Sequence, residues 1–273
     1  MSFVPAHEVV EAKGAKPRAC VFFLHGILGS RRNWLSFARR VTERFPDVRA
    51  VLVDLRNHGE SHGASPTHDL EAAARDLAEL AAHLGEEPRV VIGHSYGGKV
   101  ALVYARDFAA ALDDVWVLDS SPGLREGGGK GSVESVIAAV STLPLPIPGR
   151  KELVDALRAK GLPDSIAQWM TTNLRPTEGG FEWRFDLPAV IEMLEDYGRQ
   201  DLWPMLDAPP PEITIHFVRG ERSDRWTHDD IARLEKATER GLDLRVLPNA
   251  GHWVHTDNPD DLFAFMEGTF ARL

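Results

Sequence analysis

Short apolar runs alternate with longer helical patterns along this chain, and this alternation restricts it to a few folds. Six runs are rich in β-branched residues and do not alternate with polar residues, which is typical of parallel strands covered on both faces. The candidate strands are Val21 to Leu24, Ala50 to Val53, Val90 to Ile92, Val115 to Leu118, Ile213 to Val218 and Leu244 to Leu247.

The helical patterns lie between and after these runs. Residues 70–84 place leucines and alanines on one helical face, and Gly85 provides a stop signal. Further helical patterns cover residues 99–108, 228–240 and 259–270. Strands and helices in alternation predict an α/β fold with a mostly parallel, doubly wound sheet.

One segment, residues 120–211, interrupts the alternation. It opens with the glycine-rich run over residues 125–131 and continues through several prolines and short amphipathic patterns that carry Trp169, Trp183 and Trp203. A structureless loop of this length is improbable in a compact domain, so we expect a helical lid inserted before the last two strands. Residues 1–119 and 212–273 then form the core domain.

Composition narrows the class of partner. The formal net charge of −10 argues against nucleic acid or an anionic membrane, because both select basic surfaces. Cys20 is the single cysteine, and neither a signal peptide nor an apolar stretch of membrane-spanning length is evident. We therefore expect a cytoplasmic protein, without a membrane span, that acts on a small molecule. The sequence is silent on oligomeric state.

The motif GHSYG, residues 93–97, directly follows the apolar run 90–92 and precedes a helical pattern. A Gly-x-Ser-x-Gly motif between a strand and a helix is typical of a nucleophile elbow, which exposes a serine hydroxyl on a tight turn. Ser95 is therefore the candidate nucleophile. The helix that follows directs backbone N–H groups toward negative charge developing near it.

A serine nucleophile needs a base, and the base in turn needs an acid to orient it. In a fold of this kind the chain order is serine, acid, histidine. His252 follows Gly251 on the loop after the last candidate strand, so it is the expected base. Two acids compete, since Asp119 and Asp224 each follow a neighbouring strand, and the spacing does not choose between them.

Backbone N–H groups are expected to form the oxyanion hole. One comes from Tyr96, the residue after the nucleophile, and the other from the loop after the first core strand, which reads HGILGS over residues 25–30. Ile27 or Leu28 is then the second donor. No cluster of histidine, cysteine and carboxylate residues has metal-ligand spacing, so we expect neither a metal nor a cofactor.

The elbow, the His-Gly loop and the Gly-His loop in this order resemble the α/β-hydrolase superfamily over almost the whole chain. DLRNHGES (54–61), GHSYGGKVAL (93–102), LDSSP (118–122) and FEWRFD (181–186) resemble small esterases of the YbfF type, a branch that includes mitochondrial abhydrolase-domain proteins. The resemblance implies hydrolysis of short- to medium-chain acyl esters or thioesters without a cofactor. The bacterial members place the acid at the position of Asp119, and the superfamily more usually at that of Asp224.

The expected function is thus a carboxylesterase-type serine hydrolase that works through an acyl-enzyme. Two alternatives remain open from the sequence. The same fold hosts C–C bond hydrolases, lyases and perhydrolases, and it also hosts non-catalytic proteins that bind a ligand in the pocket.

Overall fold

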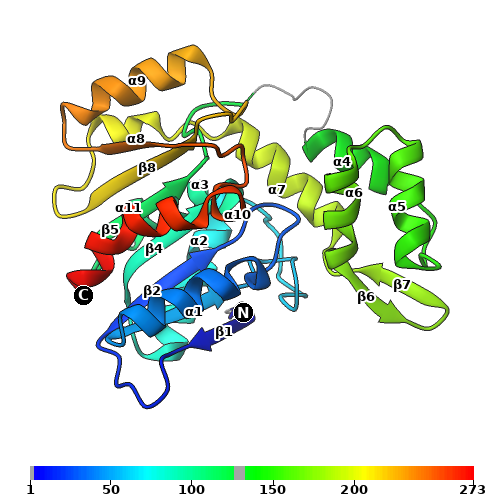
Figure 1. The fold of residues 1–273 in the computed structure, drawn as a ribbon, viewed down its shortest axis with the longest axis horizontal. Helices are drawn as coiled ribbons and strands as arrows, with labels where there is room; N and C mark the ends of the chain where they lie inside the picture. The colour runs from blue at the N-terminus through cyan, green and yellow to red at the C-terminus, as the bar shows by residue number, and fades with distance from the viewer. Residues whose placement is uncertain (1–2, 126–132) are drawn as a thin grey trace.

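The structure, a computed structural model, describes residues 3–125 and 133–273 (Figure 1). Within this part of the chain a seven-stranded sheet has the order β1-β3-β2-β4-β5-β8-β9. β1 pairs antiparallel with β3, and the remaining neighbours pair parallel. The mostly parallel sheet predicted from the sequence is confirmed. The strands are β1 His7–Val10, β2 Ala19–Leu24, β3 Val48–Val53, β4 Pro88–His94, β5 Asp114–Leu118, β8 Thr214–Gly220 and β9 Asp243–Leu247.

The edge strand β1 was not among the predicted strands. Its four residues, HEVV, are half-buried or exposed, so they lack the continuous apolar run that identifies a strand covered on both faces. β2, which lies inside the sheet between β3 and β4, is buried along its whole length, as the sequence predicts.

Helices cover both faces of the sheet. α2 (Leu70–Leu84), α3 (Tyr96–Asp107) and α9 (His228–Thr238) pack on one face, and α1 (Leu35–Arg44) and α11 (Pro259–Ala271) pack on the other. Successive residues of β2 separate accordingly, with Phe22 in the first apolar cluster and Phe23 in the second. α2 ends where predicted, at Gly85 in the left-handed conformation (φ 67°).

Residues 133–183 of the 120–211 segment lie to one side of the sheet in Figure 1, whereas the last helix of the segment, residues 203–207, lies beside α9. The helices of the 120–211 segment are α4 Val133–Val140, α5 Arg150–Ala159, α6 Asp164–Met170, α7 Leu187–Arg199 and α8 Trp203–Asp207. The segment also has a 3₁₀ turn at Thr171–Asn173, and the core has one at Arg31–Trp34. The hairpin of β6 (Leu174–Thr177) and β7 (Gly180–Trp183) was not predicted, because each strand is only four residues long. Most of the predicted glycine-rich run, residues 126–131, lies outside the described residues.

The apolar residues of the 120–211 segment belong to the same buried cluster as α2 and α3. Val136, Met170 and Val190 of the segment join Phe22 of the sheet in that cluster. α7 runs between the sheet and the outer helices of the segment (Figure 1). Within the described residues, no helix is both long enough and apolar enough to cross a membrane.

A buried lysine fastens the segment to the core. Lys99 lies on α3 with no exposed surface, and its Nζ donates to the carbonyls of Gly123 (2.7 Å), Tyr197 (2.8 Å) and Gln200 (2.8 Å). Burial lowers the pKa of Lys99 to about 8. The side chain is therefore still an ammonium at neutral pH, and its three N–H groups match three acceptors of the segment.

We expect Lys99→Met to destabilise the protein by about 3 kcal/mol, because it removes three charge-assisted hydrogen bonds and leaves buried carbonyls without a donor. Urea denaturation followed by circular dichroism measures the free energy of unfolding. The control is Lys151→Met at an exposed lysine on α5, which should leave the transition midpoint in place. Equal midpoints for the two variants would contradict the anchoring role of Lys99.

Candidate active site

Ser95 lies on the sharp turn between β4 and α3. Its backbone has φ 52° and ψ −118°, which is unusual for a residue with a side chain. Glycine is required on both sides of it. A Cβ at Gly93 would overlap the carbonyl of Gly97, and a Cβ at Gly97 would lie 2.7 Å from the carbonyl oxygen of His25. The glycines thus permit the tight turn that places Ser95 at the start of the helix.

His252 lies on the loop between β9 and the short helix α10 (Val254–Asp257). Its Nδ1 is 2.8 Å from Oδ2 of Asp119. The ring of His94 lies against that of His252 in a tilted arrangement with 4.7 Å between the centroids, and His94 Nε2 donates to the backbone carbonyl of His252 (2.8 Å). These contacts fix both the loop and the orientation of the imidazole.

Asp119 follows β5 and is fully buried, with φ 48°. Its carboxylate accepts hydrogen bonds from several groups. Oδ1 accepts from the Gly220 N–H (3.0 Å) and from Trp226 Nε1 (2.9 Å), and Oδ2 accepts from Ser223 Oγ (2.6 Å) in addition to His252. A buried carboxylate needs such donors, because an unsatisfied charge in the interior is strongly unfavourable.

Asp224, the other acid considered from the sequence, lies apart from the base. Its side chain is 83% exposed and forms an ion pair with the adjacent Arg225 at 3.2 Å. The loop that carries Asp224 instead contributes its neighbours Ser223 and Trp226 to the carboxylate of Asp119. The structure brings Asp119 to His252 and leaves Asp224 in solvent.

The loop after β2 carries Ile27 and Leu28, the two residues considered from the sequence as the second backbone donor of the oxyanion hole. The Leu28 N–H donates to Nε2 of His58 (3.0 Å) and is therefore occupied. For the N–H groups of Ile27 and Tyr96, no acceptor is found among the described residues. His58 was given no role from the sequence, and no local pattern around it indicates this contact.

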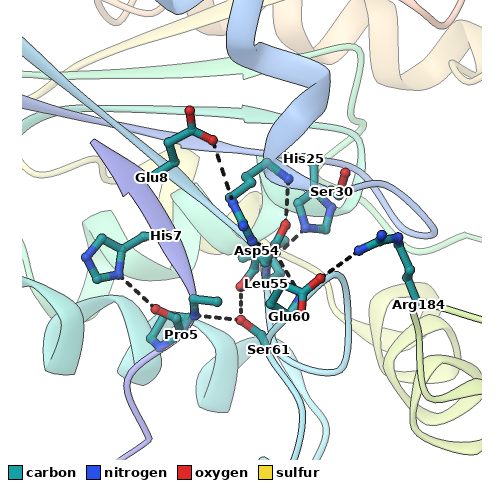
Figure 2. A network of polar contacts seen from close by, with 12 residues as sticks. Pro5, His7, Glu8, His25, Ser30, Asp54, Leu55, Glu60, Ser61 and Arg184 are labelled. Carbon is teal, nitrogen blue, oxygen red and sulfur yellow. Dashed lines mark hydrogen bonds and ion pairs between the residues drawn. The ribbon is translucent and has the colours of Figure 1, made fainter. Parts of the chain in front are cut away.

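A network of polar contacts around Asp54 joins this loop to residues 54–61 (Figure 2). The buried carboxylate of Asp54 accepts from the backbone N–H groups of Arg31 (2.7 Å) and Glu60 (3.0 Å) and pairs with the Arg31 guanidinium. His25 Nε2 accepts from the Leu55 N–H (3.0 Å). The loops that carry His25 and His58 are thereby held against each other.

The same network reaches the 120–211 segment. Nη1 of Arg184, which follows β7, lies 2.6 Å from Oε1 of Glu60, at the right of Figure 2. This ion pair is one of several contacts, like those of Lys99, that join the segment to the core, and the Asp186 N–H also donates to the carbonyl of Asn57 (3.0 Å).

Ser95 and His252 line one cavity, which encloses about 610 Å³ including space open to solvent. Ile27, Leu28 and Tyr96 line it as well. The rest of the wall comes largely from apolar side chains of the 120–211 segment, namely Val133, Val136, Ile166, Trp169 and Leu194. The residues predicted from sequence, with the exception of the two acids, thus share a single cavity, and Asp119 lies behind His252.

Comparison with known proteins gives consistent matches. A family model described as the alpha/beta hydrolase family matches residues 21–265. The sn-1-specific diacylglycerol lipase ABHD11 of Mus musculus is 32% identical over 263 residues, which cover 93% of this chain and 80% of the mouse protein. Esterase YbfF of Escherichia coli (strain K12) is 25% identical over 244 residues, 88% of each chain. The solved structure of a marine microorganism esterase superposes with a TM-score of 0.82 at 26% identity over the full length of both chains.

Several histidines around the site are buried and held as neutral acceptors or donors. Burial lowers the pKa of His58 to about 3 and that of His255 to about 4, and it also lowers the pKa values of His25 and His94. In the unfolded chain these groups bind a proton at the ordinary pKa of about 6.5. The unfolded state therefore binds more protons below pH 6.5, so their contribution to stability is complete above pH 6.5 and is lost as the pH falls toward 3.

We expect the free energy of unfolding to fall steeply between pH 6.5 and pH 5, with His58 alone contributing roughly 2 kcal/mol of the loss. Urea denaturation at pH 7, 6 and 5 measures it. In the His58→Gln variant, whose amide does not titrate, the dependence on pH should be weaker by about that amount. Stability that stays constant from pH 7 to pH 5 would contradict the buried neutral histidines.

Proposed function

The chain belongs to the alpha/beta hydrolase family, and from this premise we propose that it is a serine hydrolase that cleaves short- to medium-chain acyl esters. The observation that carries the proposal is the 2.8 Å contact between His252 Nδ1 and Asp119 Oδ2, beside the cavity that Ser95 lines. The names of the relatives, a diacylglycerol lipase and an esterase, both denote cleavage of carboxylic esters. Thioesters have the same acyl chemistry and belong to the proposed substrate class.

In the proposed mechanism Asp119 is the acid of the triad. Its carboxylate accepts a hydrogen bond from Nδ1–H of His252, which leaves Nε2 unprotonated as the base. Nε2 takes the proton of Ser95 as the hydroxyl oxygen attacks the ester carbonyl, and the imidazolium returns it to the leaving alcohol. Water then attacks the acyl-enzyme in the same way, with Nε2 again as the base, and the carboxylic acid is released from Ser95.

The oxyanion of each tetrahedral intermediate is bound, in this proposal, by the backbone N–H groups of Ile27 and Tyr96. Leu28 is the weaker of the two candidates in the loop, because its N–H already donates to His58. The N-terminus of α3 adds a favourable dipole at the same place. His58 would then act indirectly, since it holds the loop in the conformation that leaves the Ile27 N–H available.

We propose further that the 120–211 segment is a lid over the acyl pocket. Support comes from its apolar side chains, which form much of the wall of the cavity that Ser95 lines. Closing such a cover excludes water from the acyl chain and from the developing charge.

Hydrolysis of p-nitrophenyl esters from acetate upward is the first test. We expect the wild type to cleave the short and medium chains, and Ser95→Ala to lose about 10⁴-fold or more in kcat because the nucleophile is absent. A fluorophosphonate probe should label the wild type and not the variant. Labelling without cleavage of any ester would show a competent nucleophile with another substrate class, such as a C–C bond.

Asp119→Asn and Asp224→Asn form a matched pair that tests the acid. The first variant should lose about 10⁴-fold in kcat, because an amide favours the wrong tautomer of His252. The second should stay within about twofold of the wild type, since an exposed carboxylate far from the base contributes little. Steady-state kinetics on the best ester of the series decides, and a larger loss in Asp224→Asn would overturn the assignment.

A further inference from the structure

Two arginines stand out in the wall of the candidate active-site cavity. Arg125 and Arg225 both line it, with 24% and 20% of their side-chain surfaces exposed. Among the described residues that line this cavity there is no aspartate or glutamate. The protein as a whole carries 41 acidic residues against 31 lysines and arginines. The positive charge of this cavity is therefore a local feature and does not follow from a basic surface.

Arg225 is held close to the triad by its neighbours in sequence. Ser223 and Trp226 donate to the two oxygens of Asp119, and the backbone N–H of Arg225 donates to Ser223 Oγ (3.3 Å). The charge of its guanidinium is only weakly compensated. Its Nε lies 3.2 Å from the highly exposed carboxylate of Asp224 but makes no hydrogen bond of good geometry within the described chain.

Arg125 lines the same cavity from the 120–211 segment, whereas Arg225 belongs to the loop after β8. Its backbone N–H donates to the carbonyl of Gly198 (2.9 Å), which fixes the start of the side chain. Within the described residues, Nη2 of Arg125 forms a long ion pair with Oε2 of Glu134 at 3.8 Å, beyond hydrogen-bond distance. Neither Arg125 nor Arg225 stacks on an aromatic ring in the described part of the structure, so packing on a ring does not account for their position.

Both guanidinium charges act on one side chain of the cavity. Burial raises the pKa of Tyr197, while its hydrogen bond with Ser120 and the positive charges of Arg125 and Arg225 lower that pKa. The two arginines therefore lie within electrostatic range of the same phenol ring, which itself lines the cavity. The carboxylate of Asp119, behind His252, acts on Tyr197 in the opposite direction, and both arginines line the same cavity.

Arginine side chains in a largely apolar cavity are unfavourable unless a negative charge joins them. The planar guanidinium matches the oxygens of carboxylates and phosphates through paired hydrogen bonds. On the basis of the hydrolase function proposed above, we propose that Arg125 and Arg225 bind an anionic group of the substrate, a carboxylate or a phosphate. The enzyme then prefers acyl esters that carry such a group over neutral esters of the same size.

The reaction itself is ordinary ester hydrolysis. The bond between the acyl carbon and the ester oxygen breaks, water supplies the hydroxyl of the acid and the proton of the alcohol, and the bound anion remains unchanged. The arginine pair contributes binding and orientation, and the triad carries out the chemistry.

The test uses two matched pairs of substrates, one for each source of negative charge. The p-nitrophenyl monoester of adipic acid is compared with its terminal amide, which has the same shape without the charge. A monoacylglycerol phosphate is compared with the monoacylglycerol of the same acyl chain. The measured quantity is the ratio of kcat/KM for the charged substrate to that for its neutral partner.

We expect this ratio to be about tenfold or more in at least one pair for the wild type, as is usual for a charge-assisted contact. It should fall toward one in Arg125→Gln/Arg225→Gln. Arg125→Lys/Arg225→Lys should keep part of the preference, because charge remains while the planar fork is lost. Arg199→Gln is the control, since this arginine on α7 is 71% exposed and lies outside the cavity wall, and it should keep the wild-type ratio.

A preference in the adipate pair assigns a carboxylate, and one in the glycerol pair assigns a phosphate. A wild-type ratio near one in both pairs would overturn the proposal, and so would a preference that survives in the double glutamine variant. These outcomes differ from failure of the hydrolase function, which would appear as no cleavage of any ester.

If no ester is cleaved, isothermal titration calorimetry on Ser95→Ala tests the arginine site without catalysis. Binding of adipate or glycerol phosphate that disappears when both arginines are replaced by glutamine supports the arginine site. The absence of binding to Ser95→Ala overturns it.

Discussion

The carboxylate of Asp119 is the point on which the geometry of the site depends. It stands at the end of β5 and gathers donors from the end of β8, from the loop after β8 and from the loop after β9. A buried carboxylate with several donors has one low-energy arrangement of its neighbours, because each donor that withdraws leaves charge unsatisfied. The hydrogen bonds that orient His252 and the loop that carries Arg225 therefore share a single anchor, and this anchor fixes the shape of the cavity near His252.

Much of the fold could be predicted because the parallel strands are continuous apolar runs and the helices have clear periodicity. Ser95 and His252 belong to short motifs whose position in the chain order is informative. The acid is different in kind. Asp119 and Asp224 each follow a strand, and only the packing of the loops shows that one carboxylate is buried beside His252 and the other is in solvent.

The features that the sequence analysis did not predict also depend on packing between distant parts of the chain, and they have no local sequence signal. β1 and the β6-β7 hairpin are four-residue strands stabilised by their partners. The occupied N–H of Leu28 depends on His58, thirty residues away in the sequence. The placement of Arg125 and Arg225 in one cavity wall depends on how the 120–211 segment meets the core, which no spacing in the sequence encodes.

The shared apolar cluster of the 120–211 segment and the α2-α3 face has a consequence for how this protein can diversify. Side chains of the segment and of the sheet form one buried cluster, whereas the α1-α11 face forms another. Deleting or exchanging the segment would expose to water the part of this cluster that α7 covers on α2 and α3, so the segment is not an interchangeable module. Relatives with other substrate ranges can arise by point substitutions in the cavity wall, while the wholesale replacement of that wall would demand a compensating change in the core beneath it.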